Sequence, residues 1–159
     1  MSLHEIATRV GISKNTVERY IDLLEKAFII KKVPAFSRNL RNEVSKSAKY
    51  YFWDTGIRNA VLNNFNRLEL RNDVGALWEN FVVMELVKKY EYTQQYAQFY
   101  FWRTYDRKEI DLVIEHGGKL NAYEIKWGTQ KVKIPPLWEE TYGGTVEVIT
   151  RERLLEILD

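Results

Sequence analysis

Residues 110–127 read IDLVIEHGGKLNAYEIKW, with two apolar-rich runs on either side of a Gly-Gly pair. Glycine accepts positive φ at both central positions of a tight turn, so the stretch predicts a β-hairpin closed at residues 117–118. In that register Asp111 lies directly opposite Glu124. The hairpin therefore brings two carboxylates together near its open end.

The predicted hairpin has one charged face and one apolar face. Side chains alternate along a strand, so residues two apart share a face. The charged face is expected to hold Glu109, Asp111, Glu124 and Lys126, and the apolar face Ile110, Leu112, Ile114 and Ile125. Directly opposed carboxylates destabilise a strand pair, so we expect a cation between them. Lys126 is one candidate, and Mg²⁺, which prefers oxygen ligands and retains waters, is the other.

Asp111, twelve further residues and then Glu124-Ile125-Lys126 form a pattern that resembles the signature of PD-(D/E)xK nucleases. The resemblance implies that Asp111 and Glu124 hold Mg²⁺ and that Lys126 positions or polarises the attacking water. A Glu on an earlier helix often completes such sites, and Glu79 occupies the matching place. The residue before Asp111 is Ile110, where the signature has Pro. The alternative is a half-exposed strand whose charges form a surface salt-bridge ladder.

Composition narrows the class of protein. The chain has 159 residues, 45% of them hydrophobic, which is enough for one ordinary domain or two small ones. It has no cysteine, which excludes disulfides, thiolate zinc sites and a cysteine nucleophile. This composition suits the cytoplasm, and no apolar run reaches the roughly 20 residues of a membrane span. Residues 1–50 carry 10 Lys/Arg against 5 Asp/Glu, whereas the other residues carry 14 against 17. A basic first third predicts a polyanionic partner.

The basic segment contains a predicted helix-turn-helix, LHEIATRVGISKNTVERYIDLL, residues 3–24. Gly11 suits the turn, and Ser13 is a good N-cap for a second helix that runs to about Ala27. An apolar stripe is expected along that helix, at Val17, Tyr20, Ile21, Leu24 and Phe28. The DNA contacts expected on the outward face of this helix are Lys14, Asn15 and Arg19. Glu18 and Asp22 lie on the same face, and their negative charge would repel phosphate. The alternative is that the motif only packs or binds protein.

A strand is expected at residues 28–33, ended by Pro34, and a second at 50–53, with a basic loop between them. Helix-turn-helix, strand, basic loop and strand describe a winged helix. The phosphate-contact candidates in or near the wing are Arg38, Arg41, Lys46 and Lys49. The helix that normally precedes the helix-turn-helix is missing, so we expect the C-terminal portion of a longer protein.

The order of several blocks carries a broader resemblance. The blocks are IATRVGISKNTVERYIDLLEKAFIIKKVPAFSRNLRNEVSKSAKYYFWDTGIRNAVL, then GALWENFVVMEL, then FYFWRTYDRKEIDLVIEHGGKLNAYEIKW. Together they resemble the C-terminal half of a prokaryotic family of AAA-type ATPases with a C-terminal domain of uncharacterised function. The full-length family implies ATP binding. This chain has no G-x-x-x-x-G-K-[ST] stretch, so ATP is expected only in the absent N-terminal part.

The predicted architecture is α/β (α+β), a winged helix-turn-helix at residues 1–64 followed by a restriction-endonuclease-like mixed sheet flanked by helices at 65–159. The second segment is expected to contain a helix at 75–90, an aromatic strand at 98–105 and the hairpin, then a short helix at 137–141, a strand at 145–149 and a closing helix at 151–159. The expected partners are DNA and the chain's own ATPase domain, without a membrane. Two functions stay open at this point: a nucleic-acid-binding module with a Mg²⁺-dependent nuclease-like site, and a non-catalytic interaction or regulatory domain of the ATPase.

Overall fold

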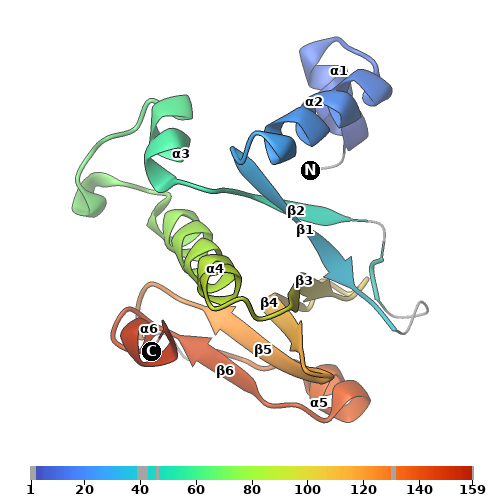
Figure 1. Ribbon diagram of the computed structural model, residues 1–159, viewed down its shortest axis with the longest axis vertical. Coiled ribbons are helices and arrows are strands. Elements are labelled where there is room, and N and C mark those ends of the chain that lie inside the picture. The colour runs from blue at the N-terminus through green and yellow to red at the C-terminus, as the bar shows by residue number, and fades with distance from the viewer. Residues whose placement is uncertain (1–2, 39–42, 46, 130–131, 159) are drawn as a thin grey trace.

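The structure, a computed structural model, describes residues 3–38, 43–45, 47–129 and 132–158. Within these residues the helices are α1 (Leu3–Val10), α2 (Lys14–Lys26), α3 (Thr55–Val61), α4 (Val74–Tyr92), α5 (Pro136–Tyr142) and α6 (Leu154–Leu158), with a 3-10 turn η1 (Leu68–Leu70). The strands are β1 (Ile30–Phe36), β2 (Ala48–Phe52), β3 (Ala97–Arg103), β4 (Glu109–His116), β5 (Lys119–Ile125) and β6 (Val146–Ile149). They form one mixed sheet in the order β2-β1-β3-β4-β5-β6 (Figure 1). The predicted mixed α/β class is confirmed.

None of the helices in the described ranges is both long enough and apolar enough to cross a bilayer.

The first two helices form as predicted, but the apolar stripe of α2 is largely uncovered. Ser13 caps α2, since its hydroxyl accepts from the Thr16 amide at 3.1 Å. Val17 is 4% exposed, whereas Tyr20 is 57% and Phe28 67% exposed. Two aromatic residues of the predicted apolar stripe are therefore exposed to solvent. α1 and β1 both contact α2, whose buried residue is Val17.

The first strand extends beyond the position where proline was expected to end it. β1 runs through Pro34, which lies opposite Ala48 of β2. The next residue carries the ladder onward, because the Ala35 amide donates to the Ser47 carbonyl at 3.0 Å. Proline lacks only its own N–H, so a strand tolerates it where that N–H has no ladder partner. The continued strand then pairs parallel with β3, at Ala35 opposite Phe101.

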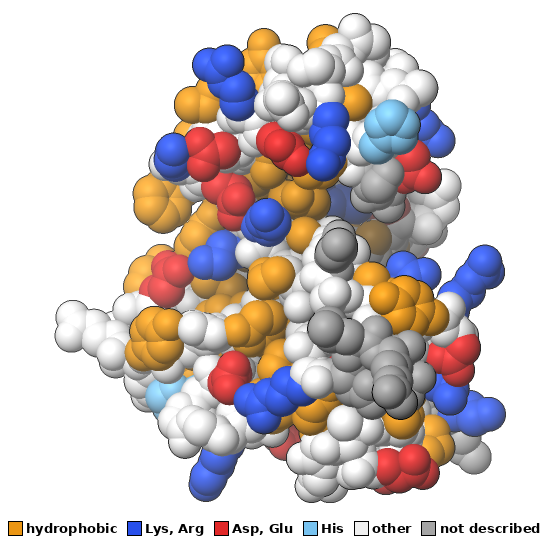
Figure 2. All heavy atoms as spheres, turned by 90° about the vertical axis from the view of Figure 1, so that its right-hand side faces the viewer, with side chains coloured by type: hydrophobic (Ala, Val, Ile, Leu, Met, Phe, Trp, Pro, Cys, Tyr) orange, Lys and Arg blue, Asp and Glu red, His pale blue; other side chains and the backbone are white. Residues whose placement is uncertain are grey.

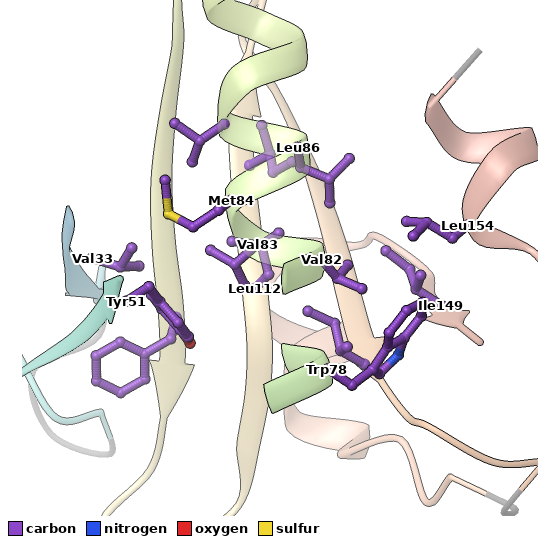
Figure 3. Packing of buried hydrophobic residues seen from close by; sticks show 14 residues of the cluster. Val33, Tyr51, Trp78, Val82, Val83, Met84, Leu86, Leu112, Ile149 and Leu154 are labelled. Atoms are coloured by element: carbon purple, nitrogen blue, oxygen red, sulfur yellow. The ribbon is translucent and has the colours of Figure 1, made fainter. Parts of the chain in front are cut away.

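The larger hydrophobic core lies between α4 and one face of the sheet. The buried side of α4 includes Trp78, Val82, Val83, Met84, Leu86 and Val87. These residues pack against residues of several strands and of α6, including Val33, Tyr51, Leu112, Ile149 and Leu154 (Figure 3). Strands from both halves of the sequence therefore share one core.

The same helix also provides hydrogen-bond partners for backbone groups at the end of β2. Asn80 is 4% exposed, and its carboxamide accepts from the Phe52 amide and donates to the Phe52 carbonyl, both at 2.8 Å. Phe52 thus gains two hydrogen bonds of the kind that a neighbouring strand would supply. This contact fixes α4 against the end of β2.

A second core covers the opposite face of the sheet beneath α5. Trp138 of α5 is fully buried and meets Trp102 edge-on, with ring centroids 5.5 Å apart. Phe36 and Ile110 belong to the same cluster. The sheet is therefore covered on both faces, by α4 and α6 on one side and by α5 on the other.

Candidate functional site

The hairpin predicted at residues 110–127 is present in the expected register. β4 and β5 pair antiparallel, with Leu112 opposite Tyr123 and the pairing continuing to the turn. The turn glycines at 117 and 118 have φ of 56° and 75°. Glycine adopts such values readily, which explains why this turn could be predicted from the sequence.

The open end of β4 departs from simple alternation. Tyr100 of β3 lies opposite Val113, but Trp102 lies opposite Ile110, so β4 contains one extra residue there. Such a bulge changes the direction of the side chains beside it. Ile110 consequently packs in the core beneath α5, whereas Leu112 packs in the core beneath α4. The expectation that these two residues share a face is wrong for this reason.

Asp111, beside the bulge, meets Glu124 through a shared ammonium group. Lys126 Nζ lies 3.0 Å from Asp111 Oδ2 and 2.7 Å from Glu124 Oε2. The Ile125 amide donates to the same Asp111 oxygen at 2.9 Å. The structure therefore brings together the three residues of the nuclease-like pattern at the end of the hairpin.

The two carboxyls have opposite pKa shifts. Burial alone would raise the pKa of Asp111, but the Ile125 amide and the nearby ammonium groups outweigh burial and lower it. Burial, together with the Asp111 carboxylate, raises the pKa of Glu124 to about 7 although Lys126 opposes the shift. Burial would lower the pKa of Lys126, but its two carboxylate partners raise it, so Lys126 is an ammonium at neutral pH.

A second lysine joins the helix to the hairpin. Lys49 Nζ of β2 lies 3.0 Å from Glu79 Oε1, 2.6 Å from Glu109 Oε1 and 3.7 Å from Asp111 Oδ1. The Tyr51 hydroxyl donates to the same Glu79 oxygen at 2.7 Å. Glu79 therefore lies beside the charged face of the hairpin, and the Lys49 ammonium group links it to Glu109 and Asp111. We call Glu79, Glu109, Asp111 and Glu124, with Lys49 and Lys126, the charged cluster.

The charged cluster opens to solvent on two sides. One cavity, of about 440 Å³, is lined by Gly75, Glu79, Ile125, Lys126, Trp127 and Gly128. Another, of about 420 Å³, includes Lys49, Tyr51 and Glu79 in its wall. A ligand can therefore approach Glu79 from either side, and Lys126 from the first.

Carboxylate oxygens are the only metal-ligating atoms of the cluster. Among the described residues, no group of three or more His, Cys, Asp or Glu side chains is arranged to hold a metal ion. Asp111 and Glu124 are a pair of oxygen donors, which matches Mg²⁺ sites that use one or two carboxylates and complete the shell with water and substrate.

The predicted DNA contacts on α2 are exposed and lie on one helix. Lys14, Asn15 and Arg19 all reach solvent. Lys14 Nζ forms an ion pair with Glu18 at 3.3 Å, one helical turn further along. Acidic groups therefore partly neutralise this surface. Figure 2 shows basic and acidic side chains interspersed on one face of the molecule.

The loop expected to form the wing is tied to the C-terminal half of the chain. The Arg38 guanidinium lies 3.0 Å from Glu115 of β4. Glu43 is 1% exposed, and it accepts from the Trp102 indole at 2.8 Å and from the Tyr142 hydroxyl. The predicted contacts Arg41 and Lys46 lie outside the described residues.

Three residues that matter for the site were either not identified from the sequence or expected in another role. Lys49 was expected to contact phosphate near the wing and instead neutralises three carboxylates. Tyr51 and Asn80 gave no signal, because their partners are distant in sequence. The one local hint is that Lys49 and Tyr51 lie two residues apart in a strand and therefore share a face.

Two family models match successive parts of the chain. Residues 1–68 match a domain of unknown function (DUF8612), and residues 74–135 match another (DUF4143). Uncharacterized proteins of Mycobacterium tuberculosis and Mycobacterium bovis are each 31% identical over 124 residues, which cover 77% of this chain and 27% of theirs. An uncharacterized protein of Haemophilus influenzae is 29% identical over 138 residues, 84% of this chain and 29% of its own.

The chain thus spans just over a quarter of the length of these curated bacterial relatives. No solved structure is a significant match. The resemblance is confirmed in part, because the chain is similar to two successive domains of uncharacterised function.

Proposed function

We propose that the chain is the C-terminal, nucleic-acid-directed part of a AAA-type ATPase and that its charged cluster is a Mg²⁺-dependent nuclease-like site. One observation carries the proposal. Asp111 and Glu124 converge on Lys126 Nζ, at 3.0 and 2.7 Å, where a cavity reaches the cluster. Two acids and a lysine in this arrangement supply both a place for a hard cation and a fixed positive charge.

The oxygen donors fit Mg²⁺. Asp111 and Glu124 would hold the ion, which when bound supplies Lewis-acid activation of water and of a phosphoryl oxygen. The raised pKa of Glu124 reflects burial beside another carboxylate, and this electrostatic conflict would favour a divalent cation between them. Retained waters and a substrate phosphate would complete the ligand set.

Lys126 would act as a charge and a hydrogen-bond donor. Its pKa is raised, so it is protonated at neutral pH and is unsuited to serve as a general base. The ammonium could orient the attacking water or neutralise a non-bridging phosphate oxygen. Glu79, 25% exposed and held by Lys49 and Tyr51, lies on the wall of the same cavity and would position Lys49 relative to the acids.

Cleavage of plasmid and single-stranded DNA in Mg²⁺ or Mn²⁺ tests this assignment. Asp111→Asn still accepts the Ile125 amide and should lose cleavage while it stays folded. Lys126→Met should lose cleavage as well. Glu115→Gln, on the same hairpin but paired with Arg38, is the matched control and should cleave normally. Cleavage retained by Asp111→Asn, or cleavage unaffected by EDTA, would reject the nuclease assignment.

DNA binding is proposed for the exposed face of α2. Lys14, Asn15 and Arg19 present donors there, and residues 1–50 have a net positive charge. If Arg19 contacts phosphate, Arg19→Ala should weaken binding and reduce the slope of log K against log salt by about 1. An unchanged slope would remove Arg19 from the interface.

A non-catalytic role in docking or positioning the ATPase is the second candidate. The position of Lys49 favours it, because this lysine already neutralises three carboxylates in the cluster. The exposed Tyr20 of α2 and the exposed Phe28 just after this helix would suit a protein partner. A melting temperature that rises with millimolar Mg²⁺, and no longer rises in Glu124→Ala, favours the enzyme, whereas no rise favours the docking domain.

A further inference from the structure

A small aromatic pocket adjoins the charged cluster. It has a volume of about 230 Å³ and is lined by Thr55, Asn59, Leu68, Val74, Leu77, Trp78, Phe81 and Trp127. We propose that this pocket is a subsite for one unstacked nucleobase of a single-stranded nucleic acid. The inference rests on the proposed function, since it identifies the kind of substrate that the charged cluster would receive.

The pocket walls suit a planar ring. Trp78 meets Trp127 edge-on with centroids 5.5 Å apart, and Phe81 lies 5.8 Å from Trp78 at an interplanar angle of 33°. Phe81 is 37% exposed, and Trp127 is half-buried, so both retain surface for a ligand. The volume is below the roughly 300–1,000 Å³ of pockets for drug-sized ligands, which restricts the occupant to a single ring system.

The neighbours of the pocket favour a nucleotide over an apolar peptide side chain. Trp127 follows Lys126 directly and also lines the 440 Å³ cavity that contains Glu79 and Lys126. The two cavities therefore share a tryptophan wall. The Arg151 guanidinium lies 5.3 Å from the Trp127 ring centroid, and its side chain is 62% exposed. A base in the pocket would thus have a cation beside it for its phosphate and the carboxylates of the cluster close by.

Two polar side chains on the wall add hydrogen-bonding groups. Asn59 and Thr55 both line the pocket. Arg71 Nη2 donates to Asn59 Oδ1 at 2.9 Å, which orients the carboxamide. An apolar lining with a few fixed polar groups is the usual composition of a small-molecule pocket.

Binding of labelled single-stranded oligonucleotides in EDTA tests the pocket without cleavage. We expect Phe81→Ala to weaken binding by about 5-fold to 150-fold, the factor given by loss of one base–aromatic stack. One abasic position in the oligonucleotide should cause the same loss with the wild-type chain and no further loss with Phe81→Ala. Phe81→Leu preserves apolar bulk and guards against misfolding. Tyr92→Ala, on the same helix with Tyr92 80% exposed, is the control and should bind normally.

A second measurement separates a base from a protein side chain. The tryptophan indole N–H resonances should shift with dAMP and not with N-acetylleucinamide. A shift with the leucine compound alone would assign the pocket to a protein segment and overturn the proposal. The proposal would also be overturned if Phe81→Ala bound the oligonucleotide as tightly as the wild type does and no abasic position weakened wild-type binding. Absence of saturable binding by the wild type would overturn it too. Because these binding measurements are made in EDTA, they can be interpreted even if the chain proves not to be a nuclease. If the chain does cleave DNA but Phe81→Ala binds the oligonucleotide with unchanged affinity, only the subsite is rejected.

Discussion

Lys49→Met tests whether one ammonium group holds the charged cluster together. Met retains most of the apolar stem of lysine and removes only the charge and its hydrogen bonds. Lys49 has three carboxylates within 4 Å, and its side chain is 23% exposed. Burial would lower its pKa, but the pKa is raised because Glu79 and Glu109 outweigh burial. The folded state therefore depends on the charged form.

The size of the loss follows from that geometry. At an effective dielectric constant of about 20, each close pair has a gross attraction of about 4 kcal/mol, most of which is offset by desolvation of the ions. Removing one partner of a buried pair costs about 3–5 kcal/mol, because the other charges remain unpaired. Because Lys49 is partly exposed, we expect Lys49→Met to lower the free energy of unfolding by an amount near the lower end of that range. Since domains are stable by only about 5–15 kcal/mol, the change should be large in a urea titration.

Urea unfolding with and without Mg²⁺ measures both the loss and its origin. Lys49→Met should unfold at a clearly lower urea concentration in EDTA, and Mg²⁺ should recover more stability for the variant than for the wild type. Saturation at 100 times the Kd returns about 2.7 kcal/mol. Lys31→Met, on the neighbouring strand with one ion pair at 3.9 Å, should change stability by less than about 1 kcal/mol. Equal midpoints for Lys49→Met and wild type would refute the reasoning.

Three further outcomes are expected. Arginine hydrogen bonds hold the pKa of Asp73 well below its usual range. Its contribution to stability is therefore full above the ordinary aspartate pKa and is lost as pH falls toward the lowered value. The difference between the urea midpoints of wild type and Asp73→Asn should narrow as pH falls from about 5 to about 2. Trp138→Ala, at a fully buried site, should lower the free energy of unfolding by about 3–5 kcal/mol in the same titration. Asn80→Leu leaves both backbone groups of Phe52 without their partner and should cost about 1–3 kcal/mol, measured as a lower melting temperature and faster amide exchange at Phe52.

Local signals determined the parts of the fold that the sequence predicted. The register of β4 and β5 follows from two turn glycines and a period of two, both contained within eighteen residues. Ser13 marks the start of α2 for a similar reason, since its hydroxyl bonds the Thr16 amide three residues later. Asp111, Glu124 and Lys126 converge because they sit on that same local hairpin.

Contacts between distant segments determined what the sequence did not predict. The bulge between Ile110 and Val113 depends on the pairing of β3 with β4, and no residue within β4 marks it. Pro34 seemed to end a strand, but whether a strand tolerates proline depends on the position of its neighbours. The exposed Tyr20 follows from how little of the chain covers α2. In each case the deciding partner lies outside the window in which periodicity can be read.

The position of Lys49 shows how a distant contact specifies a site. Lys49 lies opposite Val33 in the β1–β2 ladder, and directly opposed residues share a face of the sheet. Val33 is fully buried in the core beneath α4. A slip of one residue in this ladder would turn either Val33 to the other face or Lys49 away from Glu79. The apolar core therefore fixes the register, and the register places an ammonium group among three carboxylates. Burial of one valine on β1 thus positions a charge among three carboxylates that come from α4 and β4.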